Sequence, residues 1–283
     1  MASTTISTAD GHGKSGYVDV NGLHMYYETH GEGGEAPLVL LHGAMSAIGT
    51  SFGKLLPGLA QSRRVIAFEF QAHGHTDDID RALSVEQLAD DIAAALEQLG
   101  VTKADFLGYS LGAGVAMQVA IRHPELVRKL VTVSVTYNSG GLHPGLQEGM
   151  ATLTPDAFIG SPFYEEYQQI APRPEDFPRL VERVKALDAE VQDWPAEAVR
   201  AIEAPTLIVI GDSDIVRPEH AVEMFRLRGG GVMGDMAGLP NAQLAILPGT
   251  THITVAHRAD LLLVIVPAFL DAPMPTPVST SAE

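Results

Sequence analysis

The sequence contains no cysteine, and this absence excludes several kinds of chemistry. The 283 residues form no disulfide bond, no thiolate zinc site and no cysteine nucleophile. Basic residues are also scarce, since 18 Lys and Arg stand against 35 Asp and Glu and give a formal net charge of −17. Nucleic acids and anionic membranes are bound through clusters of Lys and Arg. We therefore expect neither nucleic acid nor a membrane surface as a partner.

Apolar runs long enough to span a bilayer are also missing. The longest, residues 261–266 continuing to 269–270, is typical of a packed terminal helix. Residues 1–16 are rich in Ser, Thr and Gly and do not resemble a secretory signal, and residues 272–283 are rich in Pro, Ser and Thr. We expect a cytoplasmic protein with disordered tails at 1–16 and 272–283. The composition leaves the oligomeric state open, with a homodimer possible.

Short apolar runs alternate with segments of helical periodicity along most of the chain. An Asn-Gly turn at Asn21-Gly22 joins two β-rich runs into a predicted hairpin over residues 17–29. Further strands are predicted at 37–41, 64–68, 106–107, 128–135, 206–210 and 243–247, and helices around 51–61, 84–99, 115–121, 218–227 and 258–270. This order indicates an α/β fold, with a mainly parallel sheet covered by helices on both faces.

Residues 138–204 interrupt this alternation with many prolines and short helical pieces. We interpret them as a small helical cap inserted into a core made of residues 17–137 and 205–271. Aromatic side chains of the cap, and one beside a candidate nucleophile, are predicted to line an apolar substrate pocket. For any single aromatic residue of the cap, packing of the cap onto the core is the favoured alternative. The predicted pocket residues are Tyr109, Phe158, Phe163, Tyr164, Tyr167 and Trp194.

The most informative motif is Gly108-Tyr109-Ser110-Leu111-Gly112. It follows an apolar run and opens a helix-forming segment, so it predicts a strand, a very tight turn and a helix with a serine at the apex. Glycine is needed on both sides because a Cβ would clash where the chain reverses so sharply. A hydroxyl at that apex lies at a helix N-terminus, which favours developing negative charge. Taken alone, the motif could also be an ordinary glycine-rich helix start.

A serine hydroxyl becomes a good nucleophile only when a base takes its proton and an acid orients that base. Both follow predicted strands: Asp214 after residues 206–210, and His252 after residues 243–247. The carboxyl ends of parallel strands meet at one edge of a sheet, so we expect Ser110, Asp214 and His252 to gather there. Asp212 competes with Asp214 for the acid role, and otherwise caps the turn by accepting backbone hydrogen bonds.

Residues 17–271 resemble the α/β-hydrolase superfamily, in particular its small capped esterases and lactonases. The segments that carry the resemblance are 41–43, 73–74, 108–112, 211–214 and 248–252. The resemblance implies an eight-stranded sheet, Ser110 as nucleophile, His252 as base and Asp214 as acid. It also implies that the N–H groups of Ala44 and Leu111 form an oxyanion hole, and that the small Ala44 widens the acyl pocket.

The sequence departs from the pattern of this superfamily at three places. The aspartate common after the fourth strand is Glu69, and the usual Pro-Gly-His-Gly loop is Gln71-Ala72-His73-Gly74. The base follows Gly249-Thr250-Thr251 instead of Gly-x-Gly, which leaves the rigidity of this segment open. His42 is expected to have a structural role, with its ring hydrogen-bonded to loop backbone.

These features predict a serine hydrolase that cleaves a carboxylic ester or lactone of a small to medium apolar substrate through an acyl-enzyme. No cofactor and no metal is expected, since His73 and His75 form only a pair of ligands in a solvated loop. The same triad could instead serve C–C bond hydrolysis, perhydrolysis, acyl transfer or cofactor-free oxygenation. A protein of another class, a hydrolase-like receptor for a small ligand, is the remaining alternative.

Overall fold

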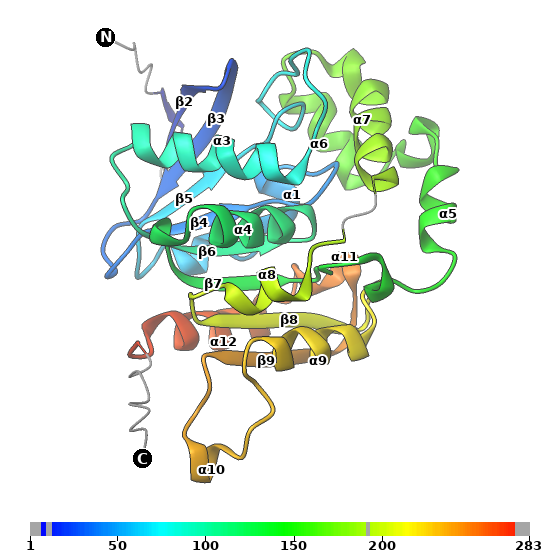
Figure 1. Cartoon of the computed structure of the whole chain (residues 1–283). Helices are drawn as coiled ribbons and strands as arrows, with labels where there is room; N and C mark the ends of the chain where they lie inside the picture. The colour runs from blue at the N-terminus through cyan, green and yellow to red at the C-terminus, as the bar shows by residue number, and fades with distance from the viewer. Residues whose placement is uncertain (1–6, 10–12, 191–192, 275–283) are drawn as a thin grey trace.

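The computed structural model describes residues 7–9, 13–190 and 193–274, and within them a single twisted sheet carries helices on both faces (Figure 1). The strand order is β1-β2-β3-β5-β4-β6-β7-β8-β9. The strands are β1 (Ser7–Ala9), β2 (Gly13–Val20), β3 (Leu23–His30), β4 (Leu38–Leu41), β5 (Val65–Phe68), β6 (Ala104–Tyr109), β7 (Val127–Val133), β8 (Thr206–Ser213) and β9 (Ala242–Thr251).

The predicted eight-stranded, mainly parallel sheet is confirmed. Strands β4 to β9 pair in parallel, and β2 and β3 form the predicted antiparallel hairpin at one end. The three-residue β1 adds a short ninth strand beside β2. Both β1 and the start of β2 fall inside residues 1–16, so this segment is not disordered throughout as predicted. Residues 275–283 of the other predicted tail lie outside the described residues.

The helices cover the two faces of the sheet because successive strand residues point to opposite sides. On β4, Val39 and Leu41 pack in one core with α3, α4, α8 and α9, whereas Leu38 and Leu40 pack in the other with α1, α2, α11 and α12. The helices are α1 (Ile48–Phe52), α2 (Leu56–Leu59), α3 (Val85–Gln98), α4 (Leu111–Arg122), α5 (Leu146–Ala151), α6 (Pro162–Ile170), α7 (Phe177–Ala189), α8 (Ala196–Ala201), α9 (Pro218–Leu227), α10 (Gly234–Ala237), α11 (His252–Val255) and α12 (Ala259–Asp271).

Helices α5, α6 and α7 form a cap beside the carboxyl ends of the parallel strands (Figure 1). The cap has its own small apolar cluster around Phe177. The end of the predicted insertion belongs to the core, because Val199 of α8 and the following Ile202 are buried in the cluster that covers one face of the sheet. The cap region is therefore shorter than the predicted residues 138–204.

Candidate active site

Ser110 occupies a strained turn between β6 and α4. Its φ of 53° and ψ of −119° are unusual for a residue with a side chain and cost about 1–3 kcal/mol. A Cβ on Gly108 would collide with the backbone of Gly112 and Ala113, and a Cβ on Gly112 would collide with the backbone of Leu41 and His42. The two glycines therefore permit the close packing that holds the serine at the apex of the turn, as the motif predicts.

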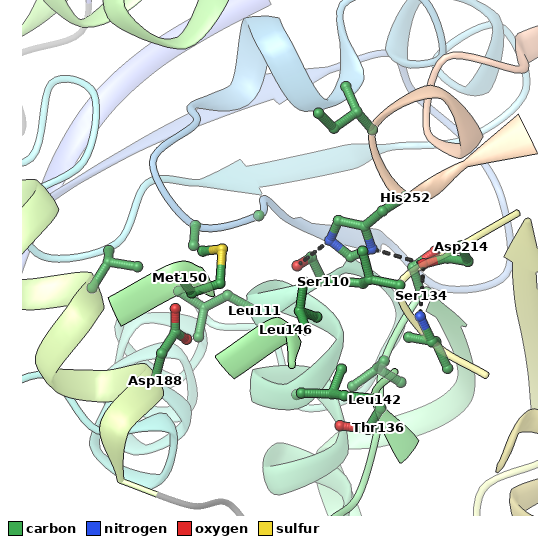
Figure 2. Close-up of a pocket in the computed structure, with 18 of the residues that line it drawn as sticks. Ser110, Leu111, Ser134, Thr136, Leu142, Leu146, Met150, Asp188, Asp214 and His252 are labelled. Atoms are coloured by element: carbon green, nitrogen blue, oxygen red, sulfur yellow. Dashed lines mark hydrogen bonds and ion pairs between the residues drawn. The ribbon is translucent and has the colours of Figure 1, made fainter. Parts of the chain in front are cut away.

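The structure brings together the three residues that the sequence predicts as a triad (Figure 2). The Nε2 atom of His252 lies 2.9 Å from the Ser110 hydroxyl oxygen, and its Nδ1 atom lies 3.0 Å from the Asp214 carboxylate. With Nδ1 protonated, the ring donates to Asp214 and leaves Nε2 free to accept the serine proton. The geometry is that of a nucleophile, a base and an orienting acid.

Asp214 is buried and accepts four hydrogen bonds. One carboxylate oxygen accepts from His252 and from the Val216 N–H, and the other accepts from the Gly211 N–H and from the Ser134 hydroxyl. Burial alone would raise the pKa of this carboxyl, but the hydrogen bonds from His252, Ser134 and Gly211 outweigh it and lower the pKa below its usual value. Asp214 is therefore held as a carboxylate beside the imidazole.

Asp212 holds the segment that precedes the base. Its carboxylate accepts hydrogen bonds from the backbone N–H groups of Gly249 at 2.9 Å and Thr250 at 3.2 Å, and these lower the pKa of its carboxyl. Thr251 then caps α11, since its hydroxyl accepts from the Thr254 N–H. The Gly249-Thr250-Thr251 segment is thus fixed by side chains, and Asp214 rather than Asp212 contacts His252.

Two backbone amides belong to residues that line the cavity beside Ser110. Leu111 is the first residue of α4, so its N–H has no acceptor within the helix. Ala44 follows β4, and both residues line the same cavity as Ser110. Within the described part of the chain, neither N–H has a hydrogen-bond partner in a loop or a side chain. They are the N–H groups expected from the sequence to form an oxyanion hole, and that role stays a prediction.

His42 supports the loops and is not available as a base. Its Nδ1 atom lies 2.7 Å from the Gly43 carbonyl oxygen, and its Nε2 atom accepts the Phe70 N–H. Complete burial, with a smaller effect from His73, lowers the pKa of His42 to about 3, so the ring is neutral.

Glu69, which replaces the usual aspartate, accepts a hydrogen bond from the backbone N–H of His75 and contacts its ring nitrogen. These contacts connect the following loop to β5.

A cavity of about 630 Å³ lies between the strand ends and the cap, and Ser110 and His252 open into it (Figure 2). This volume suits a small to medium organic molecule. Of the six predicted pocket aromatics, Tyr109, Phe158 and Phe163 line the cavity. The Tyr109 hydroxyl also donates to the His252 carbonyl oxygen at 2.9 Å, which fixes the backbone of the base.

The other three predicted pocket aromatics are wrong. Tyr164 and Tyr167 make edge contacts with the Phe177 ring and build the interior of the cap. Trp194 packs against the main core and donates from its ring nitrogen to Glu86 of α3. Tyr167 is buried, Tyr164 and Trp194 are partly buried, and none of the three lines the cavity.

Several cavity residues carry no signal in a motif. The aliphatic side chains Leu142, Leu146, Met150 and Leu153 line it from the cap, and their spacing of four, four and three residues is typical of one helix face. That periodicity could have indicated them. Ser134 and Asp188 also line the cavity, but no sequence pattern distinguishes them.

Residues 7–9, 13–190 and 193–274 contain no group of three or more His, Cys, Asp or Glu side chains that could hold a metal ion. His73 is fully buried, with its Nδ1 atom 2.8 Å from the Gln71 carbonyl oxygen and its Nε2 atom without a hydrogen-bond partner among the described residues. Among the same residues, no helix is long and apolar enough to cross a membrane.

The sequence of residues 36–156 matches the family model described as the alpha/beta hydrolase fold. This match covers less than half of the chain, and the sheet order and the strained turn at Ser110 agree with it. The chain has the fold of the α/β-hydrolase superfamily.

Related sequences in this superfamily carry out different reactions. The chain is 28% identical over 219 residues to a 2-hydroxymuconate semialdehyde hydrolase of Pseudomonas sp. (strain CF600), covering 67% of this chain and 74% of the relative. It is 34% identical over 122 residues to a pyrrolizixenacetamide deacetylase of Xenorhabdus hominickii, covering 43% and 45%. The shared scaffold therefore does not determine the substrate of this hydrolase.

Solved structures agree on the fold. An enol-lactonase from Burkholderia xenovorans LB400 superposes with a TM-score of 0.69 at 20% identity, covering 90% of this chain and 99% of that one. A thermophilic esterase from Thermogutta terrifontis gives a TM-score of 0.67 at 20% identity, covering 95% and 98%. At this level of identity the likeness establishes the α/β-hydrolase fold alone.

Proposed function

We propose that this α/β hydrolase cleaves a carboxylic ester or lactone of a small to medium substrate through an acyl-enzyme on Ser110. The observation that carries the proposal is the pair of contacts made by His252, 2.9 Å to the Ser110 hydroxyl and 3.0 Å to Asp214. The cavity of about 630 Å³ has room for such a substrate, and relatives in structure include an enol-lactonase and an esterase.

In the proposed reaction the Ser110 oxygen attacks the substrate carbonyl while His252 takes the hydroxyl proton. Asp214 keeps the imidazole in the required tautomer and stabilises its protonated form. The N–H groups of Ala44 and Leu111 bind the oxyanion, and each such donor lowers the barrier by about 3 kcal/mol. His252 then gives its proton to the leaving alcohol, and a water activated by His252 releases the acid.

The same residues could open a carbon–carbon bond next to a carbonyl group, and the relative from Pseudomonas is a semialdehyde hydrolase. The two reactions differ in the leaving group, which is an alcohol from an ester and a carbon fragment from a diketone. A panel that contains p-nitrophenyl esters, lactones and vinylogous diketones, with products identified by mass spectrometry, separates them. We expect turnover of the esters or lactones.

Replacement of the nucleophile is the direct test. Ser110→Ala removes the attacking oxygen, so p-nitrophenyl butyrate turnover should fall by about 10⁴-fold or more, towards the level left by binding and the oxyanion hole. The melting temperature should be unchanged or higher, because alanine leaves the fold and its packing in place. Ester turnover that survives in Ser110→Ala at the wild-type rate would rule out the proposed reaction.

A further inference from the structure

The carboxyl group of Asp188 lines the active-site cavity on the cap side, away from Asp214 (Figure 2). Asp188 lies in the last turn of α7, and Figure 2 shows its carboxyl group on the cavity side of this helix. Its side chain is accessible through the open cavity, but the surrounding protein atoms displace water from it. This desolvation raises the pKa of Asp188 to about 6, so the group is ionised at neutral pH.

The stability of the fold does not explain a carboxylate at this position. Among the described residues, no hydrogen bond and no ion pair of Asp188 is found. The last turn of α7 holds no basic residue, and the carbonyl groups that end a helix disfavour negative charge. Asp188 is thus an exposed, unpaired acid on the wall of the active-site cavity, where it is available to bind a group of opposite charge.

The ionisable side chains that line the cavity near Ser110 include acidic residues and histidines but no basic residue of the Lys or Arg type. The lining side chains that can be charged near neutral pH are Asp188, Glu190, Asp214, His143 and His252. Asp214 is a buried carboxylate that already accepts four hydrogen bonds, among them those from His252 and Ser134. The far side of the cavity therefore presents uncompensated negative charge, which repels a substrate carboxylate and attracts a cation.

We propose that Asp188 is a specificity-determining residue that binds a cationic ammonium group of the substrate, at the end remote from the scissile carbonyl. The proposal rests on the proposed cleavage of esters or lactones by Ser110. Aliphatic and aromatic side chains, Met150 and Phe158 among them, line the rest of the cavity and suit the apolar chain that joins the two ends. The preferred substrate is then an ester or lactone with an apolar linker and a terminal ammonium.

Matched pairs of esters isolate the effect of the charge. Each pair carries either a trimethylammonium group or the isosteric neutral tert-butyl group, at the end of the acyl chain in one series and of the alcohol in the other, with linkers of several lengths. At the best length, the wild type should favour the cationic ester by about tenfold or more in kcat/KM. Asp188→Asn should reduce this ratio to near one, whereas Glu182→Gln should keep it.

Glu182 is a suitable control because it also lies on α7 but pairs with Lys185 at the exposed surface.

The ratio of kcat/KM between the cationic and the neutral ester should also fall as the pH is lowered through about 6, since Asp188 is then protonated. An effect of pH on the triad changes the turnover of both esters of a pair and cancels in the ratio. Glu190 and His143 also line the cavity, so the pH dependence must disappear in Asp188→Asn to be assigned to Asp188.

Binding to Ser110→Ala gives a second readout that needs no turnover. Titration calorimetry should show the cationic ester binding about tenfold more tightly than the neutral one, and Asp188→Asn in the same background should remove the difference. Equal affinities in Ser110→Ala, or a cation preference that survives Asp188→Asn, would overturn the role of Asp188. Absence of any ester turnover in the wild type would contradict the proposed function and leave this binding test intact.

Discussion

Ser134 gives the buried acid of the triad a hydrogen bond that no motif predicts. It follows β7 with a φ of 56°, and its hydroxyl donates to the same Asp214 oxygen that accepts the Gly211 N–H. This oxygen faces away from His252, which binds the other one. Ser134 is therefore a positioning residue, because it orients the carboxylate that in turn orients the base.

Removal of this hydroxyl should weaken the triad without destroying it. In Ser134→Ala, Asp214 keeps its other three hydrogen bonds but loses one charge-assisted donor, so kcat should fall by about tenfold. Thr132→Val is a matched control on the same strand, since the buried Thr132 hydroxyl has no hydrogen-bond partner among the described residues. Steady-state kinetics in which both variants lose the same activity would contradict this role.

The same variant should show a pH-dependent loss of stability. Hydrogen bonds lower the pKa of Asp214 in the folded state, so their stabilisation is full above the unfolded pKa of about 3.9 and disappears as the pH falls through the lower folded value. Ser134→Ala should thus lose about 1–3 kcal/mol in the free energy of unfolding at pH 7. Urea unfolding should show that the loss shrinks below about pH 4.

At the level of single residues, the sequence predicts the members of the triad better than it predicts which side chains surround them. Ser110, Asp214 and His252 could be found because each follows a strand end, where fold topology decides which residues meet. Tyr164 and Trp194 were wrongly predicted because an aromatic ring is equally suited to a pocket and to packing. The contact between Ser134 and Asp214 depends on the backbone turn that follows β7, and no local sequence pattern predicts the geometry of that turn.

Among the elements, α7 connects the cap to the core through its basic side chains. Arg183 binds the buried Asp78 at 3.1 Å and donates to the carbonyl oxygens of Ile79 and Arg81. Arg179 of the same helix also binds Asp78, at 2.6 Å. Because α7 carries Asp188 as well, these contacts set the distance between the far wall of the cavity and Ser110.

Loss of this connection should loosen the cap. In Arg183→Met the apolar stem is preserved, but Asp78 keeps only Arg179 and the Gln71 amide as partners. The carbonyl oxygens of Ile79 and Arg81 each lose one of two donors and keep the Gln71 amide, so stability should fall by about 1–3 kcal/mol. The KM for a bulky ester should rise more than kcat falls, since the triad lies on the core. Lys185→Met removes only an exposed pair on α7 and should cost less than about 1 kcal/mol.

Thermal unfolding and ester kinetics of the two variants check this prediction. Equal effects of Arg183→Met and Lys185→Met would mean that the contacts of Arg183 do not hold the cap. The sequence indicated short helical pieces within residues 138–204, and α7 at Phe177–Ala189 is one of them. Its contact with Asp78 could not be predicted, because a charged pair between distant segments leaves no periodic pattern.

On the scale of the whole molecule, the active site exists only because the sheet assembles distant segments. Ser110 lies 142 residues from His252 and His252 lies 38 residues from Asp214 in the sequence, yet their side chains are in contact. The alternation of apolar runs and helices was enough to predict this sheet and its covered faces. The boundary of the cap was not predicted, since α8 is a short helix whose burial against the core depends on the final packing.

The most direct measurement is the reaction of the folded protein with a fluorophosphonate, followed by peptide mapping. An activated serine should be labelled stoichiometrically at Ser110 in buffer, and labelling should be lost in His252→Ala and in denaturing guanidinium chloride, which separates the three segments. Labelling of many serines, or labelling of Ser110 at the same rate in the folded wild type, in His252→Ala and in denaturant, would contradict the triad on which the account depends.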